Sequence, residues 1–246
     1  MIEQLTHPPA VYRAESENAS RFWWVWLPYL TAVVLIAVTA VNPQFVSQHL
    51  MNETTGLVEI QHALFPAIIA VLGIYMLTLR STRAEPLRVA WCAALTLGAI
   101  YLAGEETSWG FHHFGWEADG FWQEVNDQQE TNLHNISSWL DQKPRLILII
   151  GIIITGIFMP WVLINRPELA PRFMDFTYTP IALVPLAVLV FLSWFYKDLT
   201  NFFGFTDMQA LRGGEFQETF IVWYLLGYTL FLVRRARKSE QALSQA

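Results

Sequence analysis

This chain has little cysteine and little charge. Cys92 is its only cysteine, so neither a disulfide framework nor a cluster of thiolate metal ligands can form within one chain. Charged residues make up 15% of the 246 residues, against about 25% in ordinary soluble domains. The sequence also contains no glycine-rich phosphate loop, no nucleophile elbow, no internal repeat and no basic stripe suited to nucleic acid. The low charge points away from a soluble domain, and the lack of a basic stripe points away from nucleic-acid binding.

Apolar residues are abundant instead, at 54% of the chain. They form six blocks of about the length that crosses a hydrocarbon layer of about 30 Å as a helix, and the fifth and sixth blocks are short. The blocks cover about 22–42, 63–79, 87–104, 146–164, 181–196 and 216–233. The first block carries no small-residue cleavage site and is too long for a signal-peptide core, so we expect it to be retained. The sequence predicts an all-α polytopic membrane helix bundle, forming a single integral membrane domain over residues 1–246.

Basic residues predict how this bundle is oriented. Eleven of the fifteen lie before the first block, after the sixth, or between the second and third or the fourth and fifth. The other four are Lys143, Arg145, Lys197 and Arg212. By the positive-inside rule both termini are cytoplasmic, as expected for a bacterial inner-membrane protein. Fourteen of the twenty-one acids lie in or beside the three outer loops, 43–62, 105–145 and 197–215.

Two groups of polar residues border these outer loops at helix ends. Glu59 and His62 are three residues apart at the mouth of the second helix, so they share one helix face. Glu105 and Glu106 end the third apolar block, within the stretch GEETSWGFHHFGWE of residues 104–117. Ionisable groups at this depth usually face a protein interior or a watery cavity. The simpler alternative is an aromatic belt with acids at the edge of the water.

The long outer loop carries the third group. Residues 121–141 have the period of an amphipathic helix lying on the outer surface. The apolar stripe contains Trp122, Val125, Leu133, Ile136 and Leu140, and the polar stripe contains Asp127, Glu130, His134 and Asp141. Glu130 and His134 are one turn apart and could bind one ion. The alternative is an ordinary interfacial helix whose polar side faces water.

A fourth group opens the sixth helix in the segment RGGEFQETF. Glu215 and Glu218 are three residues apart there, and Gly213 and Gly214 permit a close approach of other residues. Acids in a first turn also favour the positive end of the helix dipole, so a purely structural explanation is equally good.

The segments GEETSWG and NDQQETNLHN resemble two motifs, E-E-x-S-W-G and N-x-Q-x-E-x-N-L-H-N. These belong to a family of bacterial multi-pass membrane proteins of uncharacterised function. The matching positions are Glu105, Glu106, Ser108, Trp109, Gly110, Asn126, Gln128, Glu130, Asn132, Leu133, His134 and Asn135. The resemblance covers about residues 55–136 and implies a membrane bundle but no activity, and His112 and His113 lie outside the motifs. A looser architectural analogy is to membrane hydrolases of the ceramidase type, whose ligand spacing differs.

Carboxylate and imidazole without thiolate suit zinc, iron or manganese, so our first hypothesis is a membrane metalloenzyme with its site on the outer side. The predicted ligands are Glu59, His62, Glu105, Glu130 and His134. Glu106 or Glu218 would be the general base or acid. The expected reaction is hydrolysis or transfer on a lipid or lipid-linked substrate, with a di-metal oxidase as a variant. The alternative is a non-catalytic transporter, accessory or assembly protein, whose polar cluster binds a cation or a partner or is purely structural.

Overall fold

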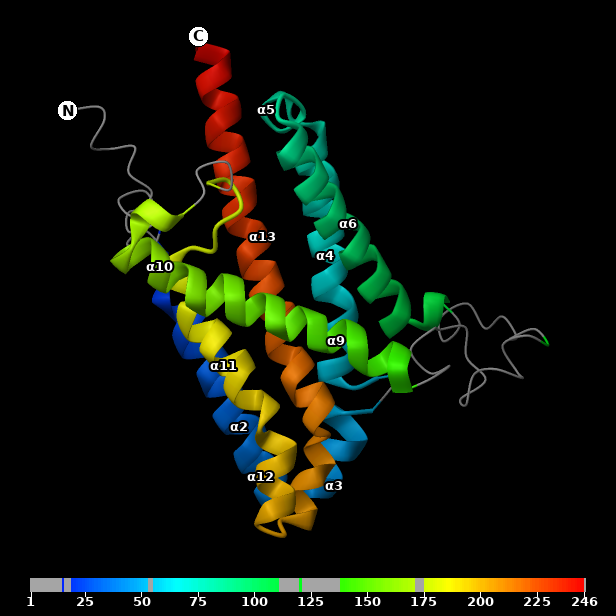
Figure 1. The fold of residues 1–246 in the computed structure, drawn as a ribbon. Helices are drawn as coiled ribbons and strands as arrows, with labels where there is room; N and C mark the ends of the chain where they lie inside the picture. The colour runs from blue at the N-terminus through cyan, green and yellow to red at the C-terminus, as the bar shows by residue number, and fades with distance from the viewer. Residues whose placement is uncertain are drawn as a thin grey trace.

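The structure is a computed structural model, and it describes residues 15, 19–52, 55–110, 120, 138–170 and 175–245. These residues form helices and connecting turns, with no strand among them (Figure 1). The all-α prediction is therefore confirmed. Most of the predicted interfacial helix, 121–141, lies outside the described residues. Its last residues, from Ser138, belong to the next helix, α9.

Six helical segments are long and apolar enough to cross a membrane, as the sequence predicts. They cover Phe22–Val41, Leu57–Thr78, Pro86–Glu106, Arg145–Asn165, Ile181–Phe202 and Gly213–Gln245. The second, third and sixth are the single helices α4 (Leu57–Thr78), α6 (Pro86–Glu106) and α13 (Gly213–Gln245). The first consists of the π-helical turn η2 (Phe22–Trp26) and α2 (Leu27–Val41). The fourth lies within α9 (Ser138–Ile153), η6 (Ile154–Phe158) and α10 (Met159–Asn165). The fifth consists of η9 (Ile181–Leu183), α11 (Val184–Trp194) and α12 (Tyr196–Phe202).

Short helical pieces connect these segments. They are α3 (Pro43–Phe45), η3 (Val46–Leu50), α5 (Arg80–Arg83), η4 (Ser108–Gly110), η7 (Pro167–Leu169) and η10 (Thr206–Leu211). Helix α5 joins α4 to α6 at the end of the bundle where the C-terminus lies (Figure 1). The polar clusters predicted from the sequence belong to the other ends of α4 and α6.

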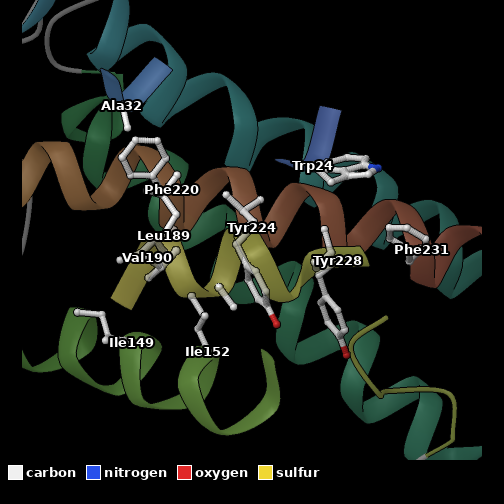
Figure 2. Packing of buried hydrophobic residues seen from close by; sticks show 14 of the residues in the cluster. Trp24, Ala32, Ile149, Ile152, Leu189, Val190, Phe220, Tyr224, Tyr228 and Phe231 are labelled. Carbon is white, nitrogen blue, oxygen red and sulfur yellow. The ribbon is translucent and has the colours of Figure 1, made fainter. Parts of the chain in front are cut away.

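Helix α13 is the centre of the bundle. Within its most apolar stretch 72% of residues are buried, against 22–39% for the other five segments, so the other helices pack around it. It contacts α4 and α11 and passes between them (Figure 1). Figure 2 shows Phe220, Tyr224 and Phe231 of α13 within the core formed with α2, α9 and α11. Apolar side chains on the outside of the bundle suit a lipid environment rather than water.

Close approach of the first segment to α13 depends on a glycine. A Cβ atom added at Gly227 would lie 2.8 Å from the ring of Trp24 and 2.9 Å from the Leu183 side chain. Small residues at helix crossings are typical of membrane bundles, where dense packing replaces the hydrophobic driving force. Hydrogen bonds add to this packing, since Trp91 Nε1 donates to the Tyr228 hydroxyl at 2.8 Å and links α6 to α13.

Candidate metal centre

Three helices bring carboxylates and an imidazole to one place. Helices α4 and α13 begin near the place where α6 ends, and both α6 and α13 contact α4. Helix α4 supplies Glu59 and His62, α6 supplies Glu106, and α13 supplies Glu215 and Glu218. The spacing of three residues in α4 and in α13 puts each pair on one helix face. We call these five residues the Glu/His cluster.

His62 is the centre of the Glu/His cluster, and its ring orientation follows from its hydrogen bonds. The side chain is fully buried, and Nε2 lies 3.1 Å from the Thr219 hydroxyl oxygen. That hydroxyl donates its only hydrogen to the backbone oxygen of Glu215 at 2.9 Å. The Thr219 oxygen therefore accepts from His62, which requires the proton on Nε2. In the neutral ring, Nδ1 is then unprotonated and carries a lone pair.

Nδ1 of His62 faces three carboxylate oxygens. The Oε2 atoms of Glu215, Glu106 and Glu218 lie 3.5, 3.9 and 4.0 Å from it. Among the described residues Nδ1 has no hydrogen-bond partner, and neither does the buried Oε1 of Glu59. A lone pair facing three carboxylates is unfavourable unless a cation lies among them. Either a proton on Nδ1 or a metal ion would supply that positive charge.

The spacing of the donor atoms suits a metal ion. One donor group is Glu59, His62 and Glu215, the other is His62, Glu106 and Glu218, and within each the donor atoms lie within 4.8 Å of one another. Two donor atoms bound tetrahedrally to one ion at about 2.1 Å lie about 3.4 Å apart. The distance from Nδ1 of His62 to Oε2 of Glu215, 3.5 Å, is close to this value. The Glu/His cluster could therefore hold a metal ion. Its oxygen and nitrogen donors suit zinc, iron or manganese, and Cys92 takes no part because it is buried in the hydrophobic core.

The charge of the Glu/His cluster is also unbalanced. Four carboxylates surround one imidazole, and Arg145 pairs with Glu218 at 2.5 Å between NH2 and Oε1. The opposite oxygen of Glu218 is the one that faces His62. Even a charged imidazole together with the guanidinium groups of Arg145 and Arg212 would leave the four carboxylates, if all ionised, in excess by one charge. Excess charge in a partly desolvated site favours the binding of a cation.

Two glycines let basic residues lie against the start of α13. A Cβ atom at Gly214 would lie 2.5 Å from NH1 of Arg145, and one at Gly213 would lie 2.8 Å from Cβ of Lys197. Any larger residue at Gly214 would therefore displace the guanidinium that pairs with Glu218. This close approach is the one that the sequence suggested for the two glycines.

Glu105 and Glu106 are neighbours but have different surroundings. Glu106 belongs to the Glu/His cluster, whereas Oε1 of Glu105 accepts a 2.8 Å hydrogen bond from Trp109 Nε1. The chain reverses after α6 through Ser108, Trp109 and Gly110, with φ angles of 46°, 54° and 93°. This left-handed turn brings the Trp109 ring back onto α6. The structure thus places the predicted acid or base, Glu106, beside His62, and the predicted ligand Glu105 beside Trp109.

The other predicted site residues have mixed outcomes. The structure brings together Glu59, His62, Glu106 and Glu218, which come from three separate sequence groups. The predicted ligands Glu130 and His134, like His112 and His113, lie outside the described residues and stay predictions. Sequence reasoning did not assign Glu215 as a ligand, although its carboxylate is the nearest of the three to Nδ1. Its position three residues before Glu218 was the available signal.

Comparison with models of known protein families, with curated proteins and with solved structures found no match. The resemblance of the GEETSWG and NDQQETNLHN segments to a membrane-protein family therefore stays a prediction. The geometry of the Glu/His cluster and its surroundings is the remaining indication of function.

Proposed function

We propose that this chain is an integral membrane protein that binds a divalent transition metal in the Glu/His cluster. The proposed activity is metal-dependent hydrolysis or group transfer on a lipid or lipid-linked substrate. The observation that carries the proposal is the buried Nδ1 of His62. The hydrogen bond from Nε2 of His62 to the Thr219 hydroxyl oxygen orients the ring, so that Nδ1 faces three carboxylate oxygens. A histidine whose other nitrogen is held by a hydrogen bond is the usual arrangement of a metal ligand.

Within this proposal the five residues divide into ligands and proton carriers. His62, Glu59 and Glu215 form one donor group and would be the principal ligands. Glu106 and Glu218 form the other group with His62 and would complete the coordination or carry a proton as general base and acid. The bound ion would supply a Lewis acid and an activated water. Glu105, Glu130 and His134 remain proposed contributors to the same centre.

The proposed location is the outer side of a bacterial inner membrane, with both termini cytoplasmic. The basic residues of the α4–α6 connection support it, because Arg80 and Arg83 lie in α5, at the opposite end of these helices from the Glu/His cluster. In this location a substrate would enter from the lipid, between the apolar helices. This is why we favour a lipid or lipid-linked substrate over a soluble one.

A structural role is the second candidate, and the pairing of Arg145 with Glu218 favours it. In this alternative His62 carries a second proton and donates it to Glu215, so the Glu/His cluster ties α4, α6, α9 and α13 together without a metal. Both candidates need the same side chains, so stability measurements alone do not separate them. Metal content does.

The deciding experiment measures metal by mass spectrometry on protein purified in detergent without chelator. We expect about one transition-metal ion per chain in the wild type and a loss of most of it in His62→Gln and Glu215→Gln. Glutamine at position 62 can still reach Thr219 but lacks Nδ1, which isolates the proposed ligand atom. His49→Gln is the matched control, because His49 is exposed and lies outside the Glu/His cluster. A folded but metal-free wild type would overturn the metal proposal and leave the Glu/His cluster as a hydrogen-bonded scaffold or a partner surface.

A second measurement tests the catalytic half of the proposal. Total lipid extract of the expression host is incubated with metal-loaded wild type and with His62→Gln, and the lipids are compared by mass spectrometry. We expect a lipid product that forms only with the metal-loaded wild type. Metal binding without any such product would reduce the function to cation binding.

A further inference from the structure

We infer that two adjoining cavities beside the Glu/His cluster bind a phosphate group carried by the substrate. The substrate class would then be a phosphate ester of a lipid or of a lipid-linked molecule. The role as a substrate site rests on the proposed function, whereas phosphate binding itself does not depend on it.

Both cavities open against the double glycine that begins α13. The larger, of about 460 Å³, is lined by Lys143, Arg145 and Lys197, and the smaller, of about 320 Å³, by Lys197 and Arg212. Lys197 and the glycines at 213 and 214 line both cavities, which therefore adjoin at this residue and this turn. Each volume is within the range of about 300–1,000 Å³ that is typical of small-ligand sites.

The charges around the cavities point to an anion. The sequence places only four basic residues on this side of the bundle, and all four line these two cavities. Lys143 and Lys197 are exposed, and neither forms an ion pair with any residue that the structure describes. On a predicted face where acids outnumber bases, such a gathering is not expected of a general surface. Lysine and arginine together are the usual ligands of phosphate oxygens.

The backbone of the double glycine adds to this charge. Gly213 and Gly214 carry no side chains of their own, and Arg145 and Lys197 lie against them at the start of α13, a helix of 33 residues. The start of a long helix attracts anions through the helix dipole. The four basic side chains carry the inference, and the helix end reinforces it.

The rest of the cavity lining favours a phosphate attached to a lipid. Leu146, Ile149 and Trp194 line the larger cavity together with its basic residues, so charged and apolar walls meet there. Trp194 is 39% exposed, which suits an aromatic ring at the boundary between lipid and water. A headgroup with the first part of its acyl or prenyl chain matches such a lining better than inorganic phosphate does.

The cavities also share residues with the Glu/His cluster. Arg145 lines the larger cavity and pairs with Glu218, while Glu215 lines the smaller cavity and lies nearest His62 Nδ1. A phosphate held by the basic residues would therefore lie next to the proposed metal. This proximity is what would connect recognition of the phosphate with the reaction.

The test uses the full chain in phosphatidylcholine nanodiscs and compares phosphatidic acid with diacylglycerol, two lipids that differ by the phosphate. Binding is measured by native mass spectrometry, and a second arm titrates inorganic phosphate in detergent. Wild type should prefer phosphatidic acid, and Lys143→Gln/Lys197→Gln should weaken its binding by about tenfold. The matched control is Arg237→Gln/Lys238→Gln, which removes two exposed charges at the far end of α13.

Each outcome decides between the alternatives. Preference for phosphatidic acid, lost only in the cavity variant, supports a lipid-borne phosphate, and equal binding of inorganic phosphate by the same lysines supports a free-phosphate site. Equal losses in the cavity and control variants, or no preference over diacylglycerol, would overturn the inference. Repeating the measurement with His62→Gln separates the two proposals. Phosphate binding that survives without metal leaves this inference standing even if the metal proposal fails.

Discussion

The two ends of α13 carry buried charges in opposite situations. Towards the C-terminus, Arg235 donates from Nε to Oε1 of Glu15 at 3.0 Å and from NH2 to Oε2 at 2.7 Å. Its NH1 donates to the backbone oxygens of Phe176 and Tyr178 at 2.8 and 2.6 Å. All three nitrogens of the guanidinium have acceptors, so no ligand is required. At the start of α13, by contrast, His62 Nδ1 has no partner among the described residues.

This difference separates a structural ion pair from a candidate binding site. A buried charge whose hydrogen bonds are complete stabilises one arrangement of the chain. A buried donor set in which some donor atoms have no hydrogen-bond partner stabilises the fold less and suits a ligand better. The Arg235 contacts therefore serve as an internal reference for the Glu/His cluster. Substitutions at the Arg235 end should lower stability, whereas substitutions in the Glu/His cluster should lower metal affinity.

The largest expected effect on stability is at the Arg235 end. Arg235→Met retains the length of the side chain but leaves Glu15 and two carbonyl oxygens without their donor. Breaking a fully buried ion pair in this way costs about 3–5 kcal/mol, and the cost here is smaller because the side chains of Arg235 and Glu15 are 10% and 23% exposed. Thermal unfolding in detergent should show a clear loss of stability, while metal content is unchanged.

The exposed neighbour Arg237 provides the control, since Arg237→Met removes the same charge from a solvent-facing position. A loss of metal in Arg235→Met at a temperature where the protein is folded would show that the two ends are coupled. The comparison between them would then fail.

The two neighbouring glutamates at the end of α6 allow the same comparison, between a candidate ligand and a residue with a hydrogen-bond partner, within one helix turn. Glu106→Gln should lower metal affinity by about 10–100-fold, because it removes one of the carboxylates facing Nδ1. Glu105→Gln removes only the charge from the acceptor of Trp109, at a cost of about 1 kcal/mol in stability and little in metal affinity. Titration with zinc or manganese, followed by thermal unfolding, measures both quantities on the same samples. Equal losses of metal affinity would make Glu105 a ligand, as the sequence predicted.

The glutamates also show how far sequence reasoning reaches. Apolar block length predicts the six membrane-spanning helices, and their alternation predicts that Glu59, Glu106 and Glu218 meet at one end. Which member of the Glu105–Glu106 pair joins the Glu/His cluster depends on the rotation of α6 about its axis, and the left-handed turn at Ser108 and Trp109 that gives Glu105 its partner leaves no periodic pattern in the sequence. The nearness of Glu215 to His62, and the hydrogen bond from Thr219, depend on the rotation of α13 against α4. That rotation is decided by packing across the whole bundle.

The smallest expected effect on stability concerns Gly214. An alanine Cβ there would meet NH1 of Arg145, the far end of a flexible side chain, which can move away at little cost. Alanine is also favoured over glycine in a helix by about 1 kcal/mol, so Gly214→Ala should leave the unfolding temperature nearly unchanged. Gly98→Ala, within α6 and with nothing within 4 Å of its added Cβ, gives the helix-propensity gain alone. Movement of Arg145 should nevertheless reduce the binding of phosphatidic acid several-fold, since its guanidinium lines the larger cavity. Unaltered binding in Gly214→Ala would mean that Arg145 serves Glu218 alone, and would confine phosphate recognition to the two lysines and Arg212.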